Sequence, residues 1–318
     1  MNDRPRLSAA EASVLTRRIT LASTGVALLL VTIKGAVWLL GGSTALLASA
    51  ADSGLDLLAS LVTFFAVRYA SSPPDAEHRF GHGKAEAFAS LMQGGLVFAS
   101  AALIGREAIG DIMNPGEVSH SGLAIVVMVI SIVLTAILIT AQGYVLKRTA
   151  SVAVAGDRAH YATDLASNGV ALLGIGAAAA FGWRGLDAIA ALVIAVLLLW
   201  GAIGVFREAA NQLMDRELPL ESRERIIALV VSDPGLTDVH QLRTRASGPY
   251  VHIQMHVDLD PALSLQQAHA AVVAAEKRIL SEFPSADIII HPDPRGAAEP
   301  HGGAFAETAL GKRGLKEG

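Results

Sequence analysis

The chain contains no cysteine among its 318 residues, and only 17% of them are charged. The absence of cysteine excludes disulfide bonds and thiolate metal sites, so any metal site must use imidazole and carboxylate ligands. These ligands suit zinc and its first-row neighbours. The charged fraction is below the roughly 25% of a soluble domain. The net charge of −4 does not suggest the basic patch of a nucleic-acid-binding protein, so no nucleic-acid partner is expected.

Apolar residues, in contrast, make up 52% of the chain, and the long apolar runs lie before residue 208. Six stretches are long enough to cross a hydrocarbon core, which takes roughly 20 helical residues. They are expected at 20–41, 45–67, 85–108, 122–145, 150–181 and 187–207. The first is expected to be a retained helix, because its apolar run exceeds the roughly 7–15 residues of a signal-peptide core. Small residues are frequent in the second, third and fifth stretches, which are therefore expected to face one another.

Basic residues indicate how these helices are oriented. They cluster before the first stretch, between the second and third, and at the junction of the fourth and fifth: Arg4, Arg6, Arg17, Arg18, Arg68, Arg79, Lys84, Lys147, Arg148 and Arg158. Only Arg106 and Arg184 lie near the opposite connections. Because basic loops stay on the cytoplasmic side, both termini are predicted to be cytoplasmic.

The pattern after about residue 208 is that of a soluble domain. Helices are expected at 220–231 and 265–283, and strands near 239–244, at 251–259 and at 286–291. The order αββαβ predicts a small α+β domain. The expected division is a transmembrane domain of 1–208, a cytoplasmic domain of 209–295, and a disordered tail of 296–318, which is rich in glycine, alanine and charge.

Two of the membrane stretches carry paired acidic and imidazole side chains. Asp52 and Asp56 are four residues apart in the second stretch, and His160 and Asp164 have the same spacing in the fifth. This spacing places each pair on one face of a helix. Two such faces in contact would supply three carboxylates and one imidazole, the four ligands of a tetrahedral zinc site. Ionised aspartates in a membrane helix cost about 2.5–3.5 kcal/mol each, so a function is expected of them.

A purely structural interpretation has these residues as polar pairs that hold helices together. It is disfavoured because Lys34, the nearby membrane cation, cannot balance three aspartates. Asn168, one turn beyond Asp164, is predicted to form an interhelical hydrogen bond and not to bind metal. Since metal binding requires deprotonated ligands, a transition metal and protons would compete for the site. His160 is expected to contribute strongly to this coupling, because imidazole titrates nearest physiological pH.

Four motifs together carry a family resemblance. They are the D-x3-D of Asp52 and Asp56, the segment 78–86 (HRFGHGKAE), the H-x3-D of His160 and Asp164, and the closing H-P-D-P of 291–294. From about residue 21 to 294 the chain resembles the cation diffusion facilitator family, in particular its bacterial ferrous-iron and zinc efflux members.

The resemblance implies a homodimer in the inner (plasma) membrane. Each subunit would have six membrane helices and a ferredoxin-like cytoplasmic domain. It implies a metal/proton antiporter that works by alternating access, and not an enzyme. Zn²⁺ is the expected cargo, with Cd²⁺, Fe²⁺ or Mn²⁺ as alternatives and protons as the counter-ion.

The resemblance also implies further site residues. Asp75, His78 and His82 match a second metal site in a loop, and Lys84 and Asp215 match a charge pair that couples the soluble domain to the membrane helices. A cytoplasmic binuclear zinc site corresponds to His240, His256, His269, His291 and Asp293. Pro292 replaces a polar residue of relatives, which puts one minor contact in doubt. For His252 a surface role is favoured over an extra ligand.

Two other functional classes stay open. An intramembrane hydrolase would use paired aspartates or zinc, but the chain has no H-E-x-x-H motif and no evident nucleophile. A passive metal channel or a metal-sensing receptor would use the same ligands without proton coupling.

Overall fold

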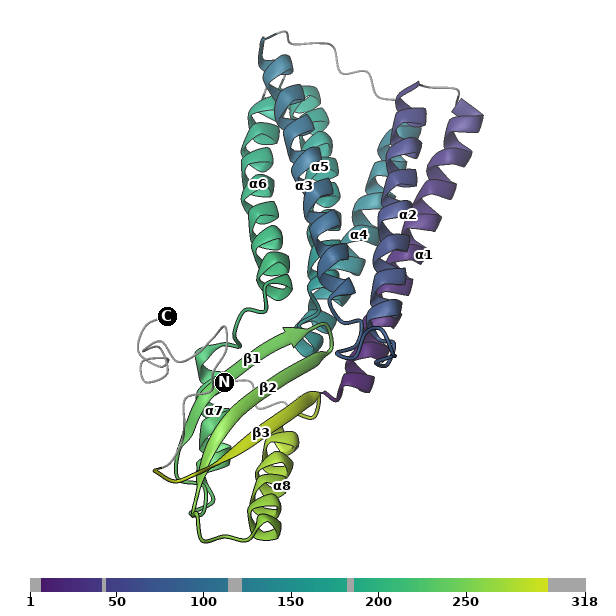
Figure 1. Ribbon diagram of the computed structural model, residues 1–318. Coiled ribbons are helices and arrows are strands. Elements are labelled where there is room, and N and C mark those ends of the chain that lie inside the picture. The colour runs from purple at the N-terminus through teal and green to yellow at the C-terminus, as the bar shows by residue number, and fades with distance from the viewer. Residues whose placement is uncertain (1–6, 42–43, 114–121, 182–185, 297–318) are drawn as a thin grey trace. The chain divides into compact units, whose positions relative to one another are not determined.

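The computed structural model describes residues 7–41, 44–113, 122–181 and 186–296 (Figure 1). The chain divides into two compact units. One spans Ala12–Asn211, and the other contains Gln212 and the residues after it together with the N-terminal residues before Ala12. The expected tail of 296–318 lies almost wholly outside the described residues.

The first unit is helical. Its helices are α1 (Ala9–Gly41), α2 (Thr44–Ala70), α3 (Ala85–Met113), α4 (Gly122–Thr149), α5 (Val152–Phe181) and α6 (Leu186–Leu213). They correspond one to one with the six predicted stretches. With 27–33 residues each, the helices reach about 40–50 Å at 1.5 Å per residue, more than the thickness of a hydrocarbon core.

Among the described residues, five helices have the length and composition of a membrane span, namely α1, α2, α3, α4 and α6. The remaining helix, α5, carries His160 and Asp164. It packs against α2, α3 and α4, and Figure 1 shows it beside α3. Its Tyr161 is buried with Ile19 of α1 and Leu138 of α4. Its polar residues therefore face other helices, which is where a membrane protein can accommodate them.

Helices α3 and α5 come very close at Gly156. A Cβ at this position would lie 3.1 Å from both Cα of Ser90 and Cβ of Gln93. As predicted, the helices of the second, third and fifth stretches pack against one another. The glycine permits this approach, because no other residue would fit beside the backbone of α3 without displacing it.

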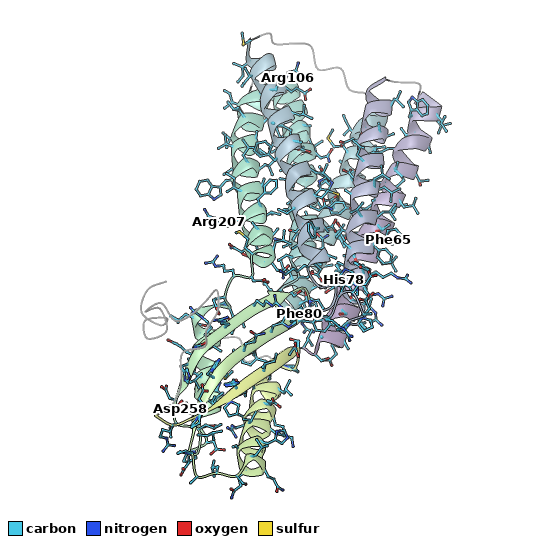
Figure 2. The ribbon with its side chains drawn as sticks, in the orientation of Figure 1. Phe65, His78, Phe80, Arg106, Arg207 and Asp258 are labelled. Carbon is cyan, nitrogen blue, oxygen red and sulfur yellow. The ribbon has the colours of Figure 1, made fainter. Side chains whose placement is uncertain are left out.

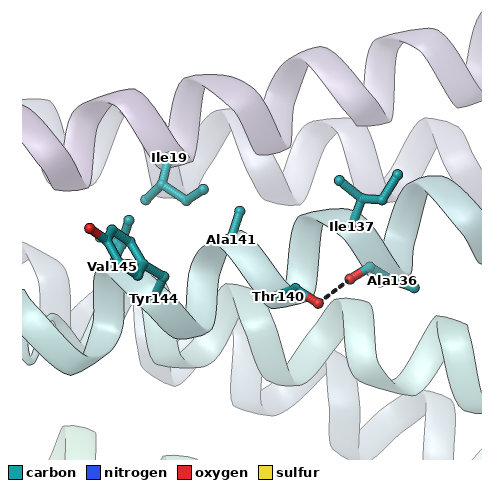
Figure 3. A pocket seen from close by; sticks show the side chains of 7 residues that line it. All are labelled: Ile19, Ala136, Ile137, Thr140, Ala141, Tyr144 and Val145. Atoms are coloured by element: carbon teal, nitrogen blue, oxygen red, sulfur yellow. Dashed lines mark hydrogen bonds between the residues drawn. The ribbon is translucent and has the colours of Figure 1, made fainter.

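The outer surface of α1 and α4 has an apolar pocket (Figure 3). The hydroxyl of Thr140 within it donates to the carbonyl of Ala136 at 2.8 Å. Ile137 and Tyr144 are exposed. Its lining has one hydroxyl from threonine and one from tyrosine and is otherwise aliphatic, so it offers no imidazole or carboxylate ligand for a metal ion.

The second unit is an α+β domain. Its elements are α7 (Leu220–Val231), β1 (Val239–Ser247), β2 (Tyr250–Leu259), α8 (Leu265–Glu282) and β3 (Ala286–Pro294). The sheet order is β1-β2-β3, with β1 antiparallel and β3 parallel to β2. The predicted order αββαβ is confirmed, and β1 and β3 each extend three residues beyond their predicted ends.

Alternation along β2 separates two faces of the sheet. Ile253, Met255 and Val257 are buried with Ile226 of α7 and Ile279 of α8. The opposite face carries His252, His256 and Asp258, because neighbouring side chains of a strand point to opposite sides. The irregular pattern of β1 reflects a bulge between His240 and Arg243, where Gln241 has a φ of 50°.

We expect Gly156→Ala to lower the unfolding temperature of the purified protein in detergent, followed by circular dichroism. The added methyl group would press on the backbone of Ser90, and overpacking costs about 1–3 kcal/mol. Gly169→Ala on the same helix is the matched control, because its Cβ would meet nothing within 4 Å. That control should be neutral or stabilising, since alanine favours a helix by about 0.5–1 kcal/mol. Equal effects of both substitutions would contradict the packing argument.

Candidate metal centres

The intramembrane centre brings together side chains of α2 and α5. His160 Nε2 lies 3.0 Å from Asp56 Oδ1 and 3.9 Å from Asp164 Oδ2. One ligand atom from each of the three residues lies within 4.8 Å of the others. His160 and Asp56 are buried. The helical spacing of four residues places His160 and Asp164 on one face of α5, and the packing of α2 against α5 supplies Asp56.

Two buried ligand atoms in this centre have no hydrogen-bond partner among the described residues. They are Nδ1 of His160 and Oδ2 of Asp164. An unsatisfied buried polar atom costs about 1–3 kcal/mol. Imidazole nitrogen and carboxylate oxygen are ligands for divalent transition metals, so the chemistry of the donor set fits such a cation.

Asp52, the fourth predicted ligand, is not part of this close group. It lies at an exposed position of α2, one turn before Asp56. The side chain of Lys34 bonds to Ser53 Oγ at 2.7 Å. Asn168 donates to the carbonyl of Asp164 in its own helix at 2.8 Å. The predicted interhelical bond of Asn168 is therefore wrong. Its amide is satisfied one turn back along α5.

A neighbouring buried network was missed by the sequence analysis. Asp157 of α5 accepts hydrogen bonds from Gln93 of α3 and Gln142 of α4, at 3.2 and 2.8 Å. Tyr161 Oη lies 2.8 Å from Ser60 Oγ and donates to the carbonyl of Ser23 at 3.1 Å. A fourth aspartate within a predicted membrane stretch was the signal that could have revealed this network.

The loop centre lies between α2 and α3, where Figure 2 labels His78. Asp75 Oδ1 lies 3.4 Å from His78 Nδ1, and Asp75 Oδ2 lies 3.1 Å from His82 Nε2. The backbone N–H groups of Glu77 and His78 donate to Asp75 Oδ1. The bond from the His78 backbone is the main reason that the pKa of Asp75 lies below its ordinary value. His82 is buried against Tyr69, with ring centroids 4.4 Å apart.

These contacts make the loop a preformed set of ligands. Asp75, His78 and His82 each offer one ligand atom within 4.8 Å of the others. Because backbone bonds fix the Asp75 carboxylate, little conformational freedom would be lost when a cation binds.

The candidate centre on the sheet of the second unit, predicted to be cytoplasmic and called the cytoplasmic centre below, follows from strand register. His240 of β1, His256 of β2 and His291 of β3 are directly aligned across the sheet. Asp293 is on the same face as His291, two residues later. Its Oδ2 lies 3.1 Å from His240 Nε2 and 2.9 Å from His256 Nδ1, and its Oδ1 lies 3.4 Å from His291 Nε2. One carboxylate thus contacts three imidazoles.

The electrostatics of Asp293 favour its anionic form. Its partial burial acts to raise the pKa, but the hydrogen bond and charge of His256, followed by His291 and His240, outweigh burial and hold the pKa below its ordinary value. Asp258, labelled in Figure 2, lies 3.8 Å from His240 Nδ1. An anionic carboxylate among imidazoles is a donor set that fits zinc.

Three other predicted residues, His269, Asp215 and Lys84, do not belong to these ligand groups. His269 is at an exposed position of α8 and is outside the close group of His240, His256 and Asp293. Asp215 pairs with Arg245 at 3.1 Å within the second unit. Its partnership with Lys84, which belongs to the first unit, stays a prediction.

His252 is buried, so the favoured surface role is wrong. Its Nδ1 lies 3.2 Å from Asp287 Oδ2 on β3. The alternation of β2 correctly placed His252 on the face of His256, but alternation says nothing about what covers that face.

We expect Asp293→Asn to weaken divalent-metal binding by the cytoplasmic centre on the order of tenfold or more, because the substitution removes the anionic oxygen shared by three imidazoles. Isothermal titration of the full-length protein with Zn²⁺ would measure this change. Asp287→Asn is the matched control on the same strand and should leave the affinity of this centre unchanged. Equal losses in the two variants would show that the charge of β3, and not the shared ligand, controls affinity.

Both units of the chain are similar to known proteins. Residues 20–214 match the family described as the cation efflux transmembrane domain, and residues 218–295 match the cation efflux protein cytoplasmic domain. The cation-efflux pump FieF of Citrobacter koseri is 41% identical over 291 residues, covering 92% of this chain and 97% of that protein. The FieF pump of Shigella flexneri is 40% identical over 280 residues, covering 88% of this chain and 93% of that protein.

Among solved structures, the metal-bound C-terminal domain of the CzcD transporter from Thermotoga maritima aligns with 25% of this chain and 94% of its own, at 28% identity and a TM-score of 0.24. The chain belongs to the cation diffusion facilitator family of cation-efflux transporters.

Proposed function

We propose that this chain exports divalent transition metal, most of all Zn²⁺, in exchange for protons. The observation that carries the proposal is the group of Asp56, His160 and Asp164 between α2 and α5, whose candidate ligand atoms lie within 4.8 Å of one another. Cd²⁺, Fe²⁺ and Mn²⁺ accept similar ligands, and the selection among them depends also on their availability in the cell.

Asp52 would be the fourth ligand. It lies one turn from Asp56 on α2, so a modest rotation or shift of this helix would bring its carboxylate toward the other three ligands. The described arrangement has three ligands close together and one apart. A transporter needs a site that gains and loses ligands as it changes its opening, because a cation must be released as well as bound.

Proton coupling follows from the chemistry of the same residues. Zinc binds deprotonated imidazole and carboxylate, so protons displace zinc and zinc displaces protons. His160 lies 3.0 Å from Asp56, and either a proton or a cation can relieve the charge of this buried carboxylate. A cycle that presents the site alternately to the cytoplasm and to the opposite side would exchange the two ions.

The chain would act as a homodimer in the inner membrane with both termini in the cytoplasm. The basic loops support this orientation. The ligand set of the loop and that of the cytoplasmic sheet would bind further zinc ions. His291 is half exposed beside Asp293, which leaves the cytoplasmic centre open to ligands from a second copy, and His269 on α8 is the residue that the resemblance implies for such a role.

Of the two rival classes, the hydrolase has less support, because members of this family are transporters and not enzymes. A passive channel uses the same ligands but would not move metal against its gradient. The dependence of metal movement on a pH gradient distinguishes this class from an exchanger.

We expect His160→Ala to lower Zn²⁺ transport into proteoliposomes by at least about tenfold, because it removes the only imidazole among the four predicted intramembrane ligands. A zinc-sensitive dye inside the vesicles would report the initial rate under an imposed pH gradient. Asn168→Ala, two turns further along α5, is the control and should retain transport, because the amide of Asn168 donates to the backbone of its own helix. Wild-type transport that ignores the pH gradient would favour the channel.

Zinc is also expected to shorten the distance between the two cytoplasmic domains of the dimer. Since the chain lacks cysteine, Gln266→Cys at an exposed position of α8 gives one labelling site per subunit. Pulsed electron spin resonance of the labelled, full-length protein would measure the distance with and without Zn²⁺. The same experiment with Asp293→Asn should lose the response. A zinc-independent distance in the otherwise wild-type protein would refute this role of the cytoplasmic centre.

A further inference from the structure

A fourth intramembrane carboxylate, Asp157, lies outside the three ligand sets. It is 1% exposed and precedes His160 by three residues on α5, a rise of about 4.5 Å along the helix. Among the described residues, no lysine, arginine or histidine lies within ion-pairing distance of it. A buried carboxylate without such a partner is costly in a membrane protein, and this cost points to a function.

Amide dipoles surround this carboxylate in place of a cation. Gln93 Nε2 donates to Oδ1 at 3.2 Å, and Gln142 Nε2 donates to Oδ2 at 2.8 Å. Gln93 also donates to Thr63 Oγ1 at 2.8 Å, and Gln142 to Ser23 Oγ at 3.1 Å. Side chains from α1, α2, α3 and α4 thus converge on one residue of α5. The arrangement stabilises the charged form of Asp157 in the absence of a counter-ion.

The same amides can also accommodate the neutral form. The carbonyl oxygens Oε1 of Gln93 and Gln142 are both buried without a hydrogen-bond partner among the described residues. A protonated carboxyl group is a donor, and an amide carries both a donor and an acceptor. If one amide rotates by half a turn about its terminal bond, its Oε1 can accept the proton of Asp157. The pocket therefore has partners for both protonation states.

The titratable groups nearest to Asp157 belong to the metal centre or are already bonded. On α5, His160 and Tyr161 interact electrostatically with it, and Asp164 lies beyond them. On α2, Asp56 contacts His160. Of the other charged side chains on these helices, Glu86 bonds to Ser151, Arg158 to the carbonyl of Ile139 and Lys34 to Ser53, and Arg148 lies over the ring of Tyr144. Asp52 is at an exposed position of α2. The rest belong to the outer thirds of their helices: Arg17, Arg18, Arg68, Arg106, Glu107 and Lys147.

We propose that Asp157 is a proton-binding site of the transport cycle, separate from the metal ligands. It holds a proton as a neutral carboxylic acid when the metal centre is empty, and it releases that proton to water when a divalent cation binds one helical turn away. The cation raises the local potential and so favours the carboxylate. By reciprocity, a proton on Asp157 weakens metal binding by the same factor. This inference rests on the proposed proton exchange.

The test measures protons moved per zinc ion in proteoliposomes of the full-length protein, with a zinc-sensitive dye and a pH-sensitive dye inside the same vesicles. Asp157→Asn keeps the size of the side chain and its capacity for hydrogen bonding with both glutamines, but cannot titrate. It is expected to move one proton fewer per zinc ion than the wild type. Thr63→Val is the control, because it removes a partner of Gln93 without removing a titratable group, and its ratio should equal the wild-type ratio.

A second variant separates proton binding from a structural role. Gln142→Leu removes a donor to Asp157 Oδ2, and this loss destabilises the carboxylate. The midpoint of the pH profile of zinc transport should therefore move to higher pH. The number of protons moved per zinc ion should not change. If Asp157→Asn is inactive, the Gln142→Leu variant provides the test. An unshifted midpoint of its pH profile then overturns the proposal. An unchanged proton ratio in an active Asp157→Asn variant also overturns it. A wild-type protein that moves zinc without protons would instead refute the proposed exchange itself.

Discussion

The requirement to compensate buried carboxylates organises the helical unit. Asp56, Asp157 and Asp164 lie between helices that are otherwise apolar, where an isolated charge would be costly. The structure compensates them in two ways. Asp56 and Asp164 are grouped with His160, and Asp157 is held by two glutamine amides. Both solutions use α5, which packs against α2, α3 and α4 and receives from them the partners of its polar side chains.

The two solutions have different chemical consequences. A set of imidazole and carboxylate ligands with unsatisfied atoms is suited to bind and release a cation. A carboxylate held by two amides, with no imidazole bonded to it among the described residues, can exchange a proton with little rearrangement. In the proposed cycle, the separation of these tasks by one helical turn would give the transporter two charge-sensitive positions that influence each other without sharing a ligand.

The sequence predicted the elements well and the contacts unevenly. The six long helices were predicted from the length of their apolar runs, and the strand Tyr250–Leu259 was predicted from its alternation of apolar and polar residues. The spacing of four residues correctly placed His160 beside Asp164, but the distance of Asp52 from this group depends on how α2 packs, which no local pattern encodes. Asn168 was assigned to a neighbouring helix because spacing cannot show whether an amide finds a partner in its own backbone. The roles of Gln93 and Gln142 arise only when α3 and α4 meet α5, because neither residue lies near Asp157 in the sequence.

The strand register of the cytoplasmic domain has a consequence for folding. His256 and His291 are aligned because β3 runs parallel to β2 in one specific pairing. A slip of β3 by one residue would turn His291 and Asp293 toward the helix-covered face, since strand side chains alternate. Only the correctly paired sheet can therefore collect its imidazoles around one carboxylate. A bound metal ion would favour that pairing over its misaligned competitors, so the ligand would act as a check on the assembly of the domain that binds it.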